Sequence, residues 1–225
     1  SAGATITTAD NTDTLSLIST DADAAVGPNL RMYRNSGSPA DNDYIGEIQF
    51  EGRNDNSQDV VYAGLASRIV DASDGTEDGR FELYTSLAGA QISRVLANST
   101  ETVINQDSVD LDFRVESNGN ANMLFVDGGN NRVGVGTNIP SVEFEIADSN
   151  SDCEMTIGSW ADNVNTKSAL NFVKSRTATI GTGAATATNE NIGEILAYGY
   201  DTGNTARTAS QILFMGDAAP DGDAV

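Results

Sequence analysis

The chain has 225 residues, enough to bury a hydrophobic core without disulfide bonds, and its single cysteine, Cys153, cannot form one within the chain. Its 33 acidic and 12 basic residues give a formal net charge of −21, which repels phosphates and so excludes nucleic acids and anionic membranes as partners. The absence of histidine excludes Ser-His and Cys-His nucleophile pairs.

The predicted elements are short strands separated by turns. The chain has 22 glycines and is dense in Asn, Asp, Ser and Thr, and the turn-forming stretches fall at residues 35–43, 72–79, 117–122 and 127–131. The nearest approach to helical spacing, Tyr62–Ile69, is short and contains Gly64, so we predict an all-β fold with almost no helix. Period-two alternation of apolar residues predicts strands at Leu15–Leu17, Leu30–Met32, Ile48–Phe50, Phe81–Leu83, Ile92–Leu96, Val109–Val115, Met123–Val126, Val133–Val135 and Val142–Ile146.

An internal repeat organises these strands. Residues 45–48 (IGEI) recur as residues 192–195, and the spacing of the flanking matches changes only across turns, where insertions are tolerated. The repeat predicts antiparallel meander modules at residues 1–108 and 151–225, the second cut short at Val225, joined by a narrow β connector at residues 109–150. The flanking matches are Leu15, Leu17 with Met155, Ile157; Leu30, Met32, Arg34 with Leu170, Phe172, Lys174; Ala66, Ser67, Ile69 with Ala209, Ser210, Ile212; and Asp74, Asp78, Gly79 with Asp217, Asp221, Gly222.

The connector carries a resemblance to a known family. In residues 112–146, Gly134 and Gly136 alternate with Val133 and Val135, which leaves one strand face bare and permits close backbone approach. This stretch resembles a connector of bacteriophage tail fibre and virion fibre proteins, in which a GNN turn, a VGIGT-like segment, a proline and a strand recur between larger β units. The resemblance implies a homotrimer with valines facing a common axis. The matching positions are Asn130, Asn131, Val133, Gly134, Val135, Gly136, Thr137, Pro140, Val142, Phe144 and Ile146, with departures at Asn138, Ile139 and Glu143.

Acidic residues are the only candidates for chemistry. Glu47 and Glu194 recur in both modules, and we expect each to pair with a nearby base, Arg34 or Lys174, rather than to act in catalysis. Carboxylates also crowd two loops, but their spacing fits no dedicated calcium loop, and we predict no metal site, no cofactor and no catalytic residue. The loop carboxylates are Asp71, Asp74, Glu77 and Asp78, and Asp217, Asp221 and Asp223.

Two further motifs are weak. The Asn98-Ser99-Thr100 triplet matches a glycosylation acceptor, a short pattern that arises often by chance. The glycines of residues 134–138 and 179–188 lack the lysine and the helix of a phosphate loop, so we predict no nucleotide site.

The sequence therefore predicts a non-catalytic structural segment of a viral fibre, a tail fibre shaft or spacer that supports host attachment. Its expected partners are itself as a homotrimer, other virion or tail proteins, and a host receptor bound through regions outside this segment. Its expected location is the virion, after assembly in the host cytoplasm. A bacterial extracellular adhesin or filament subunit and a tailspike depolymerase remain the alternatives, the latter requiring a carboxylate pair in a groove.

Overall fold

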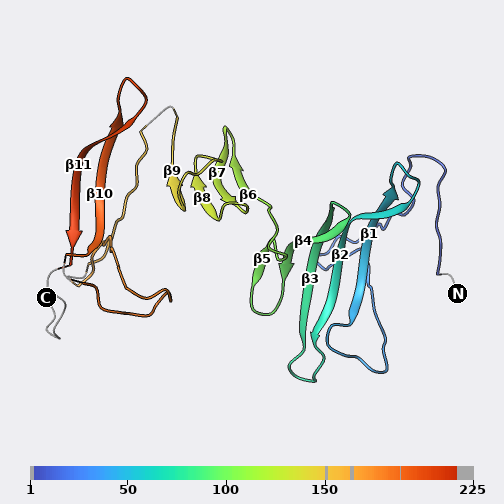
Figure 1. The fold of residues 1–225 in the computed structure, drawn as a ribbon. Helices are drawn as coiled ribbons and strands as arrows, with labels where there is room; N and C mark the ends of the chain where they lie inside the picture. Colours follow the sequence, from blue (N-terminus) through green and yellow to red (C-terminus); the bar gives the residue numbers. More distant parts are fainter. Residues whose placement is uncertain (1–2, 150–151, 163–164, 188, 217–225) are drawn as a thin grey trace. The chain divides into compact units, whose positions relative to one another are not determined.

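The computed structural model describes residues 3–149, 152–162, 165–187 and 189–216. These residues contain β-strands and no helix, so the prediction of an all-β chain is confirmed for them, and none of them forms a helix able to cross a bilayer. The chain divides into two compact units, Ser1–Cys153 and Glu154–Val225. Three separate sheets account for all the strands of the described residues (Figure 1).

The largest sheet is a five-stranded antiparallel meander in which every strand pairs with its neighbour in the chain. The loop between the first two strands is closed by Asn54, whose Oδ1 accepts hydrogen bonds from the Asn56 and Gln58 amides at 3.0 and 2.9 Å. Ser57 adopts a left-handed φ of 60° in that loop. The strands are β1 (Tyr44–Arg53), β2 (Asp59–Asp71), β3 (Asp78–Leu87), β4 (Ala90–Ala97) and β5 (Thr102–Ile104).

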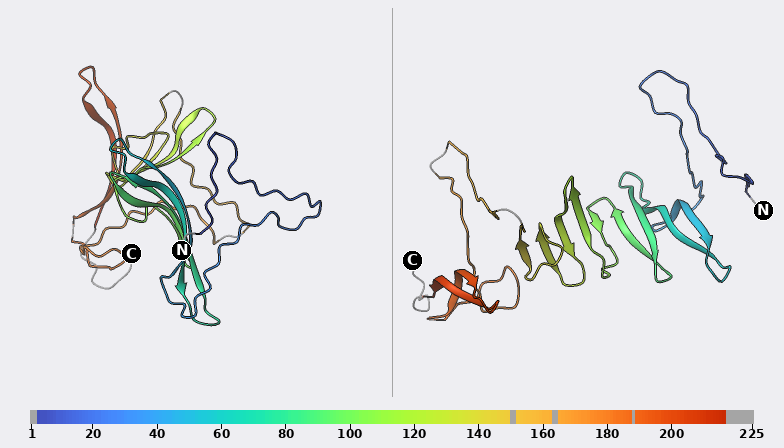
Figure 2. Two further views of the ribbon diagram at one scale, coloured as in Figure 1. Left: turned by 90° about the vertical axis from the view of Figure 1, so that its right-hand side faces the viewer. Right: turned by 90° about the horizontal axis from the view of Figure 1, so that it is seen from above.

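The second sheet lies within the predicted connector and has the order β6-β7-β8-β9. Its first three strands pair antiparallel, whereas β8 and β9 pair parallel. Figure 2 shows this sheet in olive and yellow-green. The link between the parallel strands is fixed at Pro140, whose carbonyl accepts a 2.7 Å hydrogen bond from Arg132 Nη1. The strands are β6 (Phe113–Ser117), β7 (Asn120–Asp127), β8 (Arg132–Val135) and β9 (Phe144–Ile146).

The glycines of the connector allow close backbone approach within the chain itself. A Cβ added to Gly134 would overlap the carbonyl oxygen of Thr137, and one added to Gly136 would overlap that of Ala147. Gly136 also has a φ of +81°, a left-handed conformation that disfavours any side chain. The bare face expected from the sequence is thus occupied by the chain's own backbone.

The second unit contains one antiparallel hairpin among its described residues, β10 (Asn191–Tyr200) and β11 (Ala206–Met215). Its loop repeats the hydrogen bonding of the β1–β2 loop, because Asp201 Oδ1 accepts from the Gly203 and Thr205 amides, each at 2.9 Å. Asn204 takes the left-handed position with a φ of 57°.

Several predicted strands are absent. Residues 15–17 and 30–32 form no strand, and neither do their repeat counterparts, residues 155–157 and 170–172, all of them described. The predicted strand Val109–Val115 begins only at Phe113, and Val142–Ile146 only at Phe144. Alternation marks a segment suited to one-sided burial, but a strand also needs a neighbour for its backbone hydrogen bonds. Conversely, β2 forms where the alternation predicts no strand.

Few side chains are buried. Among the described residues, the buried hydrophobic ones are Ala66, Tyr84, Leu96 and Phe125, each 3–7% exposed, and no large side chain is fully buried. Three of these four belong to the five-stranded sheet. Each sheet is a single layer, so the usual second layer that completes a core is not supplied by these strands.

We expect Gly136→Ala to lower the free energy of unfolding of the four-stranded sheet by about 3 kcal/mol, because a left-handed alanine costs about 1–2 kcal/mol and the carbonyl of Ala147 must also move. Gly119→Ala is the matched control, since its φ of +104° is positive but nothing lies within 4 Å of the added Cβ. Urea denaturation of the two variants measures both losses. Equal losses would show that Ala147 does not restrict Gly136.

Candidate functional site

The segment that precedes each large hairpin is tied to it by a charged pair. The Asp43 carboxylate accepts a 3.1 Å hydrogen bond from the Ala40 amide and lies 3.1 Å from the Arg34 guanidinium. Arg34 also donates to the Tyr44 carbonyl at 3.0 Å. These contacts fix the extended chain before β1 against the start of that strand.

The second hairpin repeats this arrangement with longer side chains. The Glu190 carboxylate accepts a 2.7 Å hydrogen bond from the Ala187 amide, and its oxygens lie 3.7 Å from Lys174 Nζ and from Arg176 Nε. The Ala187 amide, assisted by the two cations, lowers the pKa of Glu190 below its usual value.

The expected pairing of Glu47 with Arg34, and of Glu194 with Lys174, is therefore wrong. The bases pair with Asp43 and Glu190 instead. The reason is the pleat of the strand, which points successive side chains to opposite faces, so that the face contacted by the preceding segment is that of the neighbouring glycine and not that of the glutamate.

The glycine of the repeated IGEI sequence makes room for an apolar side chain. A Cβ added to Gly46 would lie 2.9 Å from Met32 Sδ, and one added to Gly193 would lie 2.7 Å from Phe172 Cβ. Phe172 in turn stacks on Phe214 with ring centroids 5.4 Å apart. The glycine is required because the preceding segment crosses the strand there.

The two hairpins share one hydrogen-bonding register. Every residue pair of the first hairpin has a counterpart in the second at a constant difference in residue number. This difference, which separates Gly46 from Gly193, is called the hairpin offset. In each hairpin one register shift falls at the start of the first strand and another near its end. The shifts lie between Tyr44 and Gly46 and between Asn191 and Gly193, then between Phe50 and Glu51 and between Ala197 and Tyr198.

The hairpin offset also relates the second strands, so that Ser67 corresponds to Phe214. The sequence match of Ala66, Ser67 and Ile69 to Ala209, Ser210 and Ile212 is therefore out of register, because each matched residue falls four positions short of its structural equivalent. The matches of Asp74, Asp78 and Gly79 to Asp217, Asp221 and Gly222 fall outside the described residues.

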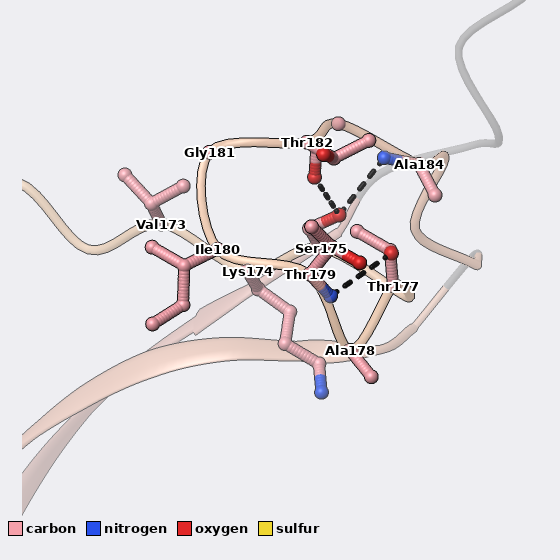
Figure 3. Close-up of a pocket in the computed structure, with 11 residues that line it drawn as sticks. Val173, Lys174, Ser175, Thr177, Ala178, Thr179, Ile180, Gly181, Thr182 and Ala184 are labelled. Carbon is pink, nitrogen blue, oxygen red and sulfur yellow. Dashed lines mark hydrogen bonds between the residues drawn. The ribbon is translucent and has the colours of Figure 1, made fainter.

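The loop before the second hairpin is longer than its counterpart in the first. Ala40 and Ala187 are separated in sequence by the hairpin offset, whereas Arg34 and Lys174 are separated by seven residues fewer. The second loop is therefore seven residues longer, and the additional residues lie between Lys174 and Ala187. Figure 3 shows that loop folded over a hollow of about 510 Å³, closed by Ser175, whose Oγ donates to the Thr182 carbonyl at 3.1 Å and accepts from the Ala184 amide at 2.8 Å. A single segment, residues 173–184, lines the hollow, and Lys174 is the charged residue of that lining.

Glu47 lies on the polar face of the five-stranded sheet. Its carboxylate accepts a short hydrogen bond from the Tyr84 hydroxyl and another from Gln49 Nε2 at 3.0 Å. On the same face Arg80 and Glu82 form an ion pair at 2.5 Å. These side chains border a polar depression of about 240 Å³. Glu47 and Glu82 are thus both engaged by neighbouring side chains.

Small residues lie beneath this polar cluster. A Cβ added to Gly64 would overlap the Tyr84 ring and hydroxyl, and Ala66 beside it is 4% exposed. Burial, followed by the hydrogen bond and the charge of Glu47, raises the pKa of Tyr84 to about 12. The polar face is therefore covered by its own long side chains.

The other acidic candidates accept hydrogen bonds from residues of their own loops. Asp71 accepts hydrogen bonds from the Ser73 amide at 2.8 Å and the Thr76 hydroxyl at 3.2 Å, which lower its pKa, and Glu77 accepts from the Gly75 amide at 3.1 Å. In the part of the chain that the structure describes, no three acidic, cysteine or histidine side chains group as metal ligands. Asp217, Asp221 and Asp223 lie outside the described residues.

Two single residues complete the predicted candidates. Asn98 closes the β4–β5 turn, since its Oδ1 accepts from the Thr100 and Glu101 amides at 2.9 and 3.0 Å. Cys153 is exposed, and its Sγ lies 3.3 Å from the Ile146 carbonyl oxygen.

Comparison with known proteins gives no match to a family model, to a curated protein or to a solved structure. The geometry of the chain itself therefore carries the functional argument.

We expect the stability of the five-stranded sheet to fall as the pH rises from about 10 to about 12. The unfolded tyrosine loses its proton near pH 10, whereas folded Tyr84 holds its proton until about pH 12, so in this window the unfolded state binds fewer protons and alkali favours it. Ultraviolet titration of tyrosinate should show one late-ionising tyrosine that Tyr84→Phe removes.

Glu47→Gln is the control for the cause of that shift. Because burial is the largest single cause and remains in the variant, the late titration should move only part of the way toward pH 10. A Tyr84→Phe protein with an unchanged late titration would contradict the assignment.

Proposed function

We propose that this chain is a non-catalytic structural segment of a homotrimeric viral fibre, built from a repeated β module and a narrow β connector. It acts as a shaft or spacer that carries host-attachment regions away from the particle. Its role is mechanical, so its chemistry is that of assembly and not of a reacting site.

The observation that carries this proposal is the lack of burial in the single chain. The chain exposes 17894 Å² of surface. A compact monomer of 23.5 kDa is expected to expose about 9,800 Å². The excess of about 8,000 Å² per chain is far more than a standard protein interface requires, and burial by other chains accounts for it.

The equivalence of the two hairpins supports a repeated module. Four features recur at the hairpin offset: the loop conformation, both register shifts, the carboxylate that pairs with the preceding segment, and the glycine that makes room for an apolar side chain. A catalytic centre has no need for such duplication, whereas a shaft lengthens by repeating one supersecondary unit. The sheet at 113–146, which falls in the region resembling phage fibre connectors, lies between the two copies in the sequence.

Three copies satisfy the requirements of a single-layer sheet. A closed ring of chains around an axis shields sheet faces and edges together, which a lone chain cannot do. The formal charge of such a trimer is 3 × (−21) = −63. Self-repulsion of that size weakens assembly at low ionic strength and keeps separate fibres apart.

We expect light scattering at about 0.15 M salt to give the mass of three chains, 3 × 23.5 = 70.5 kDa. The mass should fall toward that of one chain when the salt is lowered to about 0.01 M, where the charges are screened least. A single-chain mass at both salt concentrations would contradict the trimer.

Location on a virion has its own test. An antibody raised against residues 40–146 should label projecting fibres on purified virus particles in immunogold electron microscopy. Labelling of bacterial surfaces in virus-free cultures would instead favour the adhesin or filament subunit, for which the same β modules would serve as a surface stalk.

A further inference from the structure

We propose that one face of the five-stranded sheet, which we call the apolar face, is the surface through which copies of this chain contact one another. This inference rests on the proposed homotrimer and identifies the residues that assemble it. The apolar face consists of three rows of side chains that run across the strands, on the side opposite Glu47.

The central row is apolar on every strand. In an antiparallel sheet, directly paired residues project to the same face, so register identifies which side chains form a row. The pairing of β1 through β5 joins five apolar residues without a break: Ile48, Leu65, Leu83, Val95 and Ile104.

The two neighbouring rows are also uncharged. One, which begins at Gly46 and includes Phe81, contains only Gly, Ser, Phe, Ala and Thr; the other, which begins at Phe50, contains only Phe, Ala, Thr and Ile. Arg94 reaches this side from the register shift in β4, where its Nε donates to Thr85 Oγ1 at 2.5 Å.

Most of the apolar face is open to solvent in the single chain, although Met32 contacts it at Gly46 and Leu65 and Val95 are half-buried. Ile48 is 39% exposed, Leu83 36% and Ile104 44%, while Phe50 and Phe81 are 58% and 47% exposed. Large contiguous apolar surfaces on soluble proteins mark sites of protein–protein contact. The opposite face, in contrast, is covered by its own polar side chains.

The second hairpin leaves the corresponding side open as well. Ile195 and Ile212, paired with each other and equivalent in register to Ile48 and Leu65, are 45% and 57% exposed. An apolar hollow of about 610 Å³ lies on this side and is lined by Leu170, Phe172, Ile195 and Phe214, among others. The same uncovered positions therefore occur in both units.

Charge restricts where further copies of this chain can contact it. Each copy carries a net charge of −21, so copies can approach closely only where a surface holds no acidic residues. The three rows meet that condition, and a basic or polar partner would gain nothing from them. Contact between equivalent faces also supplies the burial that each chain lacks.

A matched pair of cysteine variants tests this assignment in a Cys153→Ser background. Ile48→Cys reports on the apolar face and Gln49→Cys, the next residue of β1, on the polar face. Both positions are exposed in the single chain. We expect a bulky polyethylene glycol maleimide to label Ile48→Cys at least about tenfold more slowly than Gln49→Cys at native assembly, because a packed interface excludes the reagent.

Three controls make the result decisive. In urea the two variants should label at equal rates, and on dilution to a single-chain mass the protection of Ile48→Cys should disappear. If Ile48→Cys does not fold, Phe50→Cys with Glu51→Cys provides a second pair on the same strand. A mass of three chains with equal native labelling would overturn this surface while leaving the trimer intact, whereas a single-chain mass would overturn both.

A charge placed on the same surface gives an independent measurement. Ile48→Glu should lower the native mass from three chains to one while circular dichroism retains its β signal, and Gln49→Glu should leave the mass unchanged. Retention of the trimer by Ile48→Glu would contradict the proposal, since three buried carboxylates would face one another without partners.

Discussion

The alternation of side chains along a β-strand is the constraint on which the rest of this structure depends. Each strand points successive residues to opposite faces, and in a single-layer sheet neither face is covered by a second layer of the same chain. The two faces of the five-stranded sheet differ in how far their side chains are covered. Tyr84, Glu47 and their neighbours cover small residues on one face, while Ile48 and Leu83 remain uncovered on the other.

The glycine and the glutamate of the repeated IGEI sequence are adjacent, and they make contacts on opposite faces of the strand. Gly46 leaves space for Met32 of the preceding segment, and Glu47 accepts the Tyr84 hydroxyl on the opposite face. In the second hairpin Phe172 takes the place of Met32 at Gly193, and Glu194 accepts from Gln211 at 2.6 Å.

Sequence reasoning located most of the strands that pair with a chain neighbour, but it missed β2, where the alternation of apolar residues predicts no strand. The strands β3, β4, β7 and β8 fall at or near their predicted positions because each pairs with a chain neighbour across a short turn. The segments around Leu15 and Leu30 have the same alternation but no paired strand among the described residues. The glutamate pairing was mistaken because distance along the chain did not reveal which face the base would reach, a question settled by Asp43.

By itself, the sequence determined the all-β character of the chain and the phase of its alternating strands, because both follow from local side-chain preferences and turn residues. It also located the IGEI repeat. Only the tertiary structure decided that β2 and β11 correspond at the same offset as β1 and β10, because register depends on bulges that no composition reveals. It likewise decided that the apolar row from Ile48 to Ile104 is continuous, since that requires the pairing of all five strands, and that Ile48, Leu83 and Ile104 in this row are exposed.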